Sequence, residues 1–266
     1  MNSAKPKHIG VLYTSGLDST FLVYKNLKEG NVVQPFYVRL SNNDTKTKAE
    51  LYNIDKQIEL FREAYGESIK SIRTIMKLNI DEFSYTTALV QAPMWVYALQ
   101  FVQNCDIDEF QIGYVMNDCA ISYLDEIKIL YRTFHGLAMM GSKQVPLAFP
   151  LTKYSKVDIL TDLPGKYRRY LWSCEMPRVI GEDDHIEYHP CGGTCHPCTK
   201  YHNIEREFKR GFPESYPSLY GKIIDIEGYK ERFICTDKPK LTIITNDAGI
   251  GVPTSWPDVD EPMRIA

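Results

Sequence analysis

Short apolar segments alternate with longer segments of helical periodicity along residues 8–140. Ile54, Ile58 and Phe61, for example, recur on one face of an otherwise polar stretch. This alternation predicts an α/β fold, in which a parallel sheet carries helices on both faces. Pro35 falls inside the second expected strand, where a proline is unfavourable because it lacks an N–H group. The expected strands are 8–13, 32–38, 68–75 and 109–113, and the expected helices are 20–27, 46–65, 93–103 and 124–140.

The loop between the first expected strand and the first expected helix has the composition of an anion-binding turn. Its sequence is Thr14-Ser15-Gly16-Leu17-Asp18-Ser19. Gly16 lets backbone N–H groups approach a phosphate, hydroxyl groups can donate hydrogen bonds, and the positive end of the helix faces the ligand. Asp18 can cap the helix or help to hold a magnesium ion. Parallel sheets bind ligands beyond the carboxyl ends of their strands, so a phosphate site is expected here, although an ordinary helix cap has the same composition.

Four of the seven cysteines are concentrated in one segment. In a reducing compartment such a cluster predicts a metal site rather than disulfides. Four thiolates suit tetrahedral zinc and leave no open coordination position, so the expected role is structural. Any one of four nearby histidines is an alternative ligand. The cysteines are Cys174, Cys191, Cys195 and Cys198, and the histidines are His185, His189, His196 and His202.

The charge balance and the distribution of apolar residues exclude some classes of protein. The 266 residues include 31 Lys and Arg and 34 Asp and Glu, so the net charge is −3. A protein that coats nucleic acid usually has a strong basic excess, so nucleic acid is not the expected direct substrate. No stretch approaches the roughly 18 apolar residues of a membrane span, and the polar N-terminus lacks the apolar core of a signal peptide. We therefore expect a cytoplasmic protein with no membrane partner.

The loop resembles the Ser-Gly-Gly-x-Asp-Ser signature of the PP-loop ATP pyrophosphatases. Gly16, Asp18 and Ser19 are identical to the signature, whereas Thr14 and Ser15 replace its first Ser and first Gly. The resemblance implies a HUP-like, Rossmann-type domain that binds ATP through residues 14–19. It also implies that ATP is split into AMP and pyrophosphate while a carbonyl or a carboxylate is adenylated. The loop is not a Walker A motif, because no Gly-Lys-Ser/Thr follows it.

A second set of motifs resembles the 7-cyano-7-deazaguanine synthase family over about residues 8–210. The family ends in a Trp-Ser-Cys run, a spacer, and a Cys-Gly pair followed by two further cysteines, and this chain has the same order. It also carries a Pro-Leu pair followed by a Lys-x-acid stretch, and a Gly followed by an Asp, a Tyr and another Asp. The corresponding residues are Trp172-Ser173-Cys174, Cys191-Gly192, Cys195, Cys198, Pro150-Leu151, Lys156-Val157-Asp158, Gly113, Asp118, Tyr123 and Asp125.

This resemblance implies an ATP-dependent carbon–nitrogen ligase. Its substrates would be 7-carboxy-7-deazaguanine and ammonia, and its product would be 7-cyano-7-deazaguanine (preQ0), as in queuosine biosynthesis. The implied cofactors are Mg²⁺ and structural Zn²⁺. The loop with Asp18 is assigned to pyrophosphate and magnesium, Lys156 to phosphate charge, Arg39 to nucleotide or substrate, and Asp125 to the deazaguanine edge. The family tendency is to form a homodimer. The implied regions are an ATP-binding domain at 1–164, a zinc-binding helical segment at 165–210, and an extension of unknown role at 211–266.

The segments expected to hold the substrate depart from the family pattern. The family reads Tyr-Gly-Gln-Arg after its second strand, where this chain has Tyr37-Val38-Arg39. Its Pro-Gly-Arg-Asn run corresponds here to Pro93-Met94-Trp95-Val96. Several alternatives therefore stay open. The reaction could stop at the amide or attach the deazapurine to another acceptor, the chain could be a tRNA-modifying enzyme of the thiolation type, or it could be a binding module without catalysis.

Overall fold

The computed structural model describes residues 5–40, 43–78, 91–116, 118–138, 140–181, 187–201, 204 and 224–225. Within these ranges, no helix is long and apolar enough to cross a membrane. The sequence also predicts a strand at 241–245 and a helix at 203–209, which lie outside the described residues apart from Ile204. The same holds for the extension at 211–266, of which only residues 224–225 are described.

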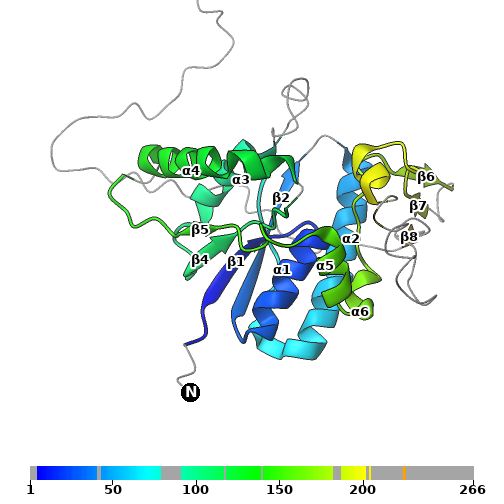
Figure 1. Cartoon of the computed structure of the whole chain (residues 1–266), viewed down its shortest axis with the longest axis horizontal. Helices are drawn as coiled ribbons and strands as arrows, with labels where there is room; N and C mark the ends of the chain where they lie inside the picture. Colours follow the sequence, from blue (N-terminus) through cyan, green and yellow to red (C-terminus); the bar gives the residue numbers. More distant parts are fainter. Residues whose placement is uncertain are drawn as a thin grey trace, which may run out of the picture.

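Five parallel strands form the central sheet, in the order β3-β2-β1-β4-β5 (Figure 1). The four strands expected from the sequence are all present, although β3 begins at Arg73 rather than at residue 68. The fifth, β5, was not expected, because two residues are too few to show a pattern. The strands are β1 (His8–Leu12), β2 (Val32–Leu40), β3 (Arg73–Leu78), β4 (Glu109–Gln111) and β5 (Leu147–Ala148).

Helices cover both faces of this sheet, which confirms the predicted α/β class (Figure 1). One face packs against α1 (Leu17–Lys28), α2 (Asp44–Tyr65), α5 (Lys156–Asp162) and α6 (Gly165–Arg168). The other packs against α3 (Gln91–Ala98), the 3₁₀ turn η3 (Leu99–Val102) and α4 (Leu124–Ala138). Each face has its own cluster of buried apolar side chains, as expected when a parallel sheet is buried on both sides.

The proline in β2 is tolerated because it lies beside a gap in the sheet. The carbonyl of Phe36 accepts a hydrogen bond from Tyr13 N on the β1 side, so the backbone of Pro35 faces β3. Pairing with β3 begins only at Phe36. Gln34 fills the gap, because its Nε2 donates to the carbonyl oxygens of Pro35 (3.0 Å) and Ser71 (2.8 Å). The missing N–H of proline therefore removes no hydrogen bond between strands.

The cysteine segment contains more β-structure than the expected helical segment. It carries an antiparallel sheet of β6 (Arg178–Ile180), β7 (Glu187–His189) and β8 (Ile224–Asp225), followed along the chain from β7 by a helical turn at 196–201. The segment does not form a separate core. Tyr167, Leu171 and Tyr201 belong to the same buried cluster as β1 and α1. Residues on both sides of position 164 therefore share one hydrophobic core.

Candidate functional site

A cavity of about 160 Å³ opens where the order of the sheet reverses. The chain passes from β1 to β2 on one side, whereas β4 lies on the other side of β1. In sheets of this kind, ligands bind in the crevice at such a point, beyond the carboxyl ends of the strands. Residues at the ends of β1, β2 and β4 line the cavity, together with α3 and the expected loop. Its polar lining includes Thr14, Gly16, Asp18, Ser19 and Asp118.

The loop leaves the N-terminus of α1 available to a ligand. Gly16 is the N-cap of this helix, and no side chain caps it. Ser19 Oγ instead closes the loop on itself, accepting a hydrogen bond from Thr14 N (3.3 Å) and donating one to Gly16 O (3.2 Å). An uncapped helix of 12 residues directs its first N–H groups and its positive end at the cavity.

Gly113, directly beyond β4, lets this helix approach the sheet closely. A Cβ atom at this position would lie 3.1 Å from the carbonyl carbon of Asp18 and 3.3 Å from Ser19 N. Any larger residue would therefore push the start of α1 away from the strand. The glycine thus allows the end of the loop to pack directly against the segment after β4, at the wall of the cavity.

Ser15 adopts a backbone conformation that normally requires glycine. Its φ angle is 56°, and it is the only non-glycine residue with positive φ among those described. It occupies the position at which the Ser-Gly-Gly-x-Asp-Ser signature has its first Gly. The residue is fully buried, its Oγ has no hydrogen-bond partner, and its carbonyl accepts from Trp172 N at 3.1 Å. Its side chain does not line the cavity, so any ligand contact would come from its backbone.

Replacing Ser15 by Gly is expected to stabilise the protein. The change removes both the strain of a positive φ and a buried hydroxyl without a partner, each of which costs on the order of 1 kcal/mol. We expect the midpoint of urea unfolding to rise by an amount equivalent to about 1–2 kcal/mol. Ser15→Ala is the matched control, because it removes the hydroxyl but keeps the strained backbone. If the glycine variant were no more stable than the alanine variant, strain at this position would be negligible.

Two carboxylates and two ammonium groups meet at the rim of the cavity. Lys156 Nζ forms an ion pair with Asp18 Oδ2 and lies 3.9 Å from Asp118 Oδ1. Lys200 Nζ lies 3.0 Å from the same oxygen of Asp118. Asp118 Oδ2 accepts from the backbone N of Val115 at 3.0 Å, which fixes the orientation of the carboxylate. Asp18 Oδ1 is buried and has no hydrogen-bond partner, so it can accept a further ligand.

The environment of these groups sets their protonation. Burial raises the pKa of Asp18 above its ordinary value; Lys156 opposes this shift and Asp118 adds to it. Burial disfavours the charged form of Lys156, but Tyr201, Asp18 and Asp118 outweigh it and raise the pKa of this lysine. Lys156 therefore stays protonated at neutral pH. It can neutralise negative charge, but it cannot act as a base.

Aromatic side chains form the opposite part of the cavity lining. The rings of Trp95 (α3) and Tyr114 (after β4) are stacked, with centroids 6.2 Å apart and an interplanar angle of 29°. Tyr114 also packs against Phe149 at 5.7 Å. Burial raises the pKa of Tyr114, so its hydroxyl is neutral at physiological pH. Such a surface suits a planar heterocycle, which can stack on aromatic rings.

The four cysteines come together as the spacing predicts. Their sulfur atoms all lie within 4.8 Å of one another, and all four residues are buried. Backbone N–H groups point at the sulfurs: Cys191 N donates to Cys174 Sγ at 3.2 Å, and Cys195 N donates to Cys191 Sγ at 3.3 Å. Gly192 and Gly193, with φ angles of 76° and 94°, form the tight turn between these ligands. A hydrogen bond from Cys198 lowers the pKa of Cys174 to about 5, which favours a thiolate there.

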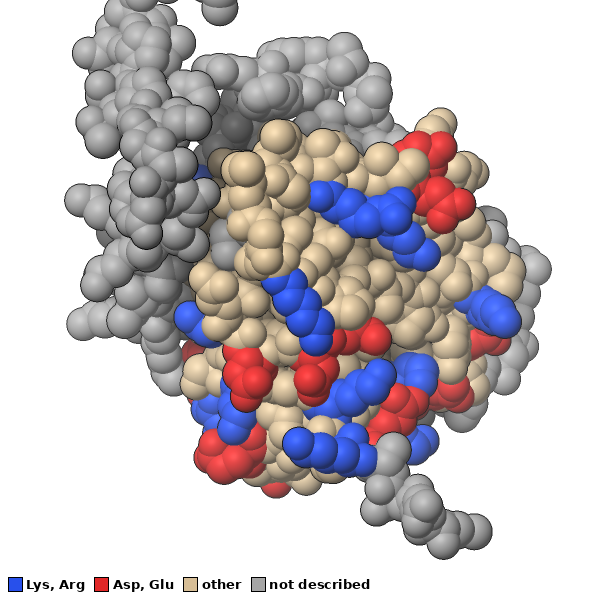
Figure 2. Space-filling view, turned by 90° about the vertical axis from the view of Figure 1, so that its left-hand side faces the viewer, with Lys and Arg blue, Asp and Glu red and all other residues tan. Residues whose placement is uncertain are grey.

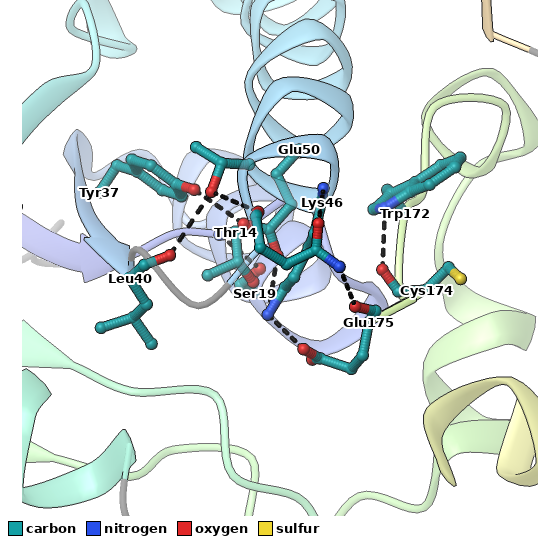
Figure 3. A network of polar contacts seen from close by, with 11 residues as sticks. Thr14, Ser19, Tyr37, Leu40, Lys46, Glu50, Trp172, Cys174 and Glu175 are labelled. Atoms are coloured by element: carbon teal, nitrogen blue, oxygen red, sulfur yellow. Dashed lines mark hydrogen bonds and ion pairs between the residues drawn. The ribbon is translucent and has the colours of Figure 1, made fainter. Parts of the chain in front are cut away.

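A second polar network ties the cysteine segment to the start of α2 (Figure 3). Lys46 is only 6% exposed, forms an ion pair with Glu175, and lies 3.8 Å from Glu50 Oε1. Tyr37 OH donates to Glu50 Oε2 at 2.8 Å. Asn43 Nδ2 donates to the carbonyl of Glu175 at 3.1 Å. Because Glu175 directly follows the first cysteine, this network fixes the cluster against the helix that packs beside the loop.

No protein-family model matches this chain, and no curated protein matches it. Solved structures resemble it weakly. One is the U34-tRNA thiolase NcsA from Methanococcus maripaludis with its 4Fe-4S cluster, at 18% identity and a TM-score of 0.42, over 77% of this chain and 68% of that one. Another is a 4-thiouridine synthetase in complex with RNA and with bound ATP. It is 14% identical, its TM-score is 0.43, and the match covers 62% of this chain and 40% of that one. At these scores the site must be interpreted from its own geometry.

Two of the residues expected at the site lie elsewhere. Arg39, near the end of β2, lies 4.0 Å from Asp44 Oδ1 and does not line the loop cavity. Asp125, in the first turn of α4, lines a different cavity of about 280 Å³ together with Lys128 and Arg132. The structure therefore brings together the loop, Asp18 and Lys156, but neither of these two residues.

Sequence reasoning missed several residues of the cavity and its rim. Asp118 appeared only as part of a motif, and the signal that could have assigned it a role was its position shortly after β4, at the same sheet edge as the loop. Lys200 and Tyr201 come two and three residues after the last cysteine, and no local pattern separates them from an ordinary polar turn. No local pattern identifies the stacked rings of Trp95 and Tyr114 either, because one lies in α3 and the other follows β4. These missed residues are Asp118, Lys200, Tyr201, Trp95 and Tyr114.

Proposed function

We propose that this chain is an ATP-dependent adenylating enzyme of the PP-loop type. The observation that carries the proposal is the uncapped N-terminus of α1, which faces a cavity lined by Asp18 and Asp118 at the reversal point of a parallel sheet. A pyrophosphate group fits this set of donors. The free N–H groups and Lys156 would hold its oxygens, and the two carboxylates would hold Mg²⁺. When bound, Mg²⁺ would neutralise charge on the phosphates.

The finer proposal concerns the acceptor of AMP. The stacked rings of Trp95 and Tyr114 favour a planar heterocycle, and the resemblance of the motifs favours a 7-deazaguanine carboxylate. Its carboxylate would attack the α-phosphate of ATP and release pyrophosphate, leaving an acyl adenylate. Ammonia would then displace AMP, with loss of one proton, to give the amide. Adenylation of the amide oxygen by a second ATP, followed by loss of AMP and a proton, would give the nitrile.

The residues of the chain act in this scheme by position and charge. The loop and the start of α1 would hold the pyrophosphate in line with the attacked phosphorus, which is the main requirement of a displacement at phosphorus. Lys156, protonated at neutral pH, would offset negative charge that develops on the leaving pyrophosphate. Asp18 would fix both the lysine and the cation. No covalent intermediate on the protein is needed.

The cysteine cluster is proposed to hold one zinc ion. Tetrahedral Zn–S bonds of about 2.3 Å place the sulfurs roughly 3.8 Å apart. The observed upper limit of 4.8 Å fits one ion better than a cluster in which each cysteine binds a separate iron. Four thiolates would leave no open position, so the ion would supply structure rather than chemistry. It would fix Trp172 and Glu175, which contact the loop and α2.

The charge on one face of the protein is mixed rather than basic. On the face shown in Figure 2, Lys and Arg side chains are interspersed with Asp and Glu, and its described part carries no continuous basic surface. Binding of a nucleic acid normally relies on clustered Lys and Arg. Together with the net charge of −3, the mixed charge on this face supports the ligase over a tRNA-modifying enzyme of the thiolation type.

Incubation with ATP, Mg²⁺, ammonium and 7-carboxy-7-deazaguanine tests the proposal. Mass spectrometry should show AMP, pyrophosphate, and a product whose mass distinguishes the nitrile from the amide by one water. 7-Deazaguanine, which lacks the carboxylate, is the matched control and should give no AMP. Release of AMP without either product would refute the deazaguanine assignment but keep the adenylation. Metal analysis distinguishes the ligase from the tRNA-modifying enzyme of the thiolation type. One zinc per chain supports the ligase, whereas iron supports a thiolase.

A further inference from the structure

The helical turn at 196–201 links the cysteine cluster to the charged rim of the cavity. Thr199 N donates to Cys195 O at 3.0 Å, and Thr199 Oγ1 donates to Gly193 O at 2.8 Å, so the turn is attached to the tight loop between the cysteines. At its far end, Tyr201 is buried in the main core, and its ring lies 5.4 Å from Lys156 Nζ. The turn is therefore fixed at both ends.

Lys200 projects from this turn to Asp118, which lines the loop cavity. Its Nζ lies 3.0 Å from Asp118 Oδ1, which is also 3.9 Å from Lys156 Nζ. Without a ligand, the two lysines and the two aspartates neutralise one another. We propose that Lys200 is a phosphate-binding residue of the nucleotide site, released to the β- and γ-phosphates when Mg²⁺ occupies the carboxylates. This inference rests on the proposed use of ATP.

Electrostatics favours such an exchange of partners. A divalent cation competes strongly for two carboxylates, because hard oxygen ligands are those that Mg²⁺ prefers. The polyphosphate of ATP brings several negative charges to the same place. The flexible four-carbon stem of a lysine lets its ammonium group move from a carboxylate to a neighbouring phosphate oxygen. Each ammonium group thereby keeps a negatively charged partner.

The ion pair between Lys200 and Asp118 contributes little to the stability of the fold. Its side chain is 29% exposed and that of Asp118 is 20% exposed. A single ion pair that is still partly exposed contributes only modestly to folding stability. Tyr201 and the cysteines, rather than Lys200, attach the turn to the rest of the protein. Removal of the ammonium group should therefore leave the fold intact and reveal any role in binding.

Isothermal titration calorimetry with ATP, and separately with AMP, in the presence of Mg²⁺ tests the inference. Lys200→Met should weaken the binding of ATP by about 10- to 100-fold, the effect of one charged hydrogen bond. Its affinity for AMP should be unchanged, because AMP lacks the β- and γ-phosphates. Lys200→Arg should retain most of the affinity for ATP. The matched control is Lys48→Met, at an exposed position of α2.

The outcomes separate this inference from the proposed function. If the wild-type protein does not bind ATP, the proposed function fails and the inference fails with it. If the wild type binds ATP and Lys200→Met binds it equally well, only the inference fails. Equal weakening for ATP and AMP would also overturn it, since the lysine would then act on the adenosine end or on the structure of the loop. Lys200→Gln provides a second neutral variant should the methionine variant not fold.

Discussion

Replacing Asp18 by Asn is expected to lower the release of AMP at least about a hundredfold, because the variant keeps the shape of the side chain and removes its charge. Asp18 forms the ion pair with Lys156, and its second oxygen is buried without a partner. The variant would therefore lose a ligand for Mg²⁺ and leave Lys156 with only the more distant Asp118. Release of AMP and pyrophosphate at saturating ATP measures the effect.

Asp162→Asn is the matched control for this prediction. Asp162 lies at the exposed end of α5, the helix that begins at Lys156, and does not line the cavity. Its replacement should leave AMP release unchanged. Thermal unfolding of both variants, measured in parallel, separates a loss of ligand binding from a loss of structure. Release of AMP by Asp18→Asn within tenfold of wild type would contradict a direct role in catalysis.

Removal of the proposed zinc ion from the cysteine cluster is expected to abolish the binding of ATP as well as to destabilise the protein. Structural zinc contributes roughly 10–16 kcal/mol to the folding of isolated zinc peptides, so its loss should unfold the cysteine segment. Two contacts of the site, one at the loop and one at the rim of the cavity, depend on the cysteine segment. Trp172 N donates to Ser15 O at 3.1 Å, and the turn after Cys198 carries Lys200 to Asp118.

The change that tests this prediction is Cys198→Ser, combined with treatment of the wild type with a chelator. Metal content, circular dichroism and ATP affinity are the three measurements. We expect zinc to be lost and ATP binding to fall below detection, while the parallel sheet keeps most of its secondary structure. Cys105→Ser is the control, because Cys105 lies outside the cluster, beside Arg73. If ATP binding survived without the metal, the cluster and the loop would be independent.

The parts of the fold that could be predicted are those with a repeating local signal. β1, β2, α2 and β4 lie close to their expected bounds, because burial on two faces gives continuous apolar strands and burial on one face gives helical spacing. β5 has only two residues, and the seven residues of α5 span less than two helical turns, so neither shows such a signal. α1 begins at Leu17 rather than at residue 20, because the carbonyl of Gly16 already accepts the first helical hydrogen bond, from Thr20 N at 2.9 Å, and Asp18 lies within the first turn.

The residues of the candidate site also include some that could be predicted from the sequence and some that could not. The cysteine cluster could be predicted because its ligands are close in sequence and their chemistry is distinctive. The charged rim could not, because Asp118 and Lys200 are 82 residues apart and each is individually unremarkable as a surface charge. Trp95 and Tyr114 become neighbours only through the order of the sheet. Arg39 and Asp125 were assigned by the resemblance, and the structure places both outside the loop cavity.

The hydrogen bond from Trp172 N to Ser15 O has a consequence for the synthesis of the protein. Ser15 leaves the ribosome well before Trp172 and the cysteines that follow it, which are made much later. At a translation rate of roughly 5–20 residues per second, the loop waits on the order of 10 s or longer for its partner. A nascent chain arrested before residue 172 should therefore contain most of the parallel sheet but an incomplete loop. The ability to bind ATP would be acquired late in translation, after metal has reached the cysteines.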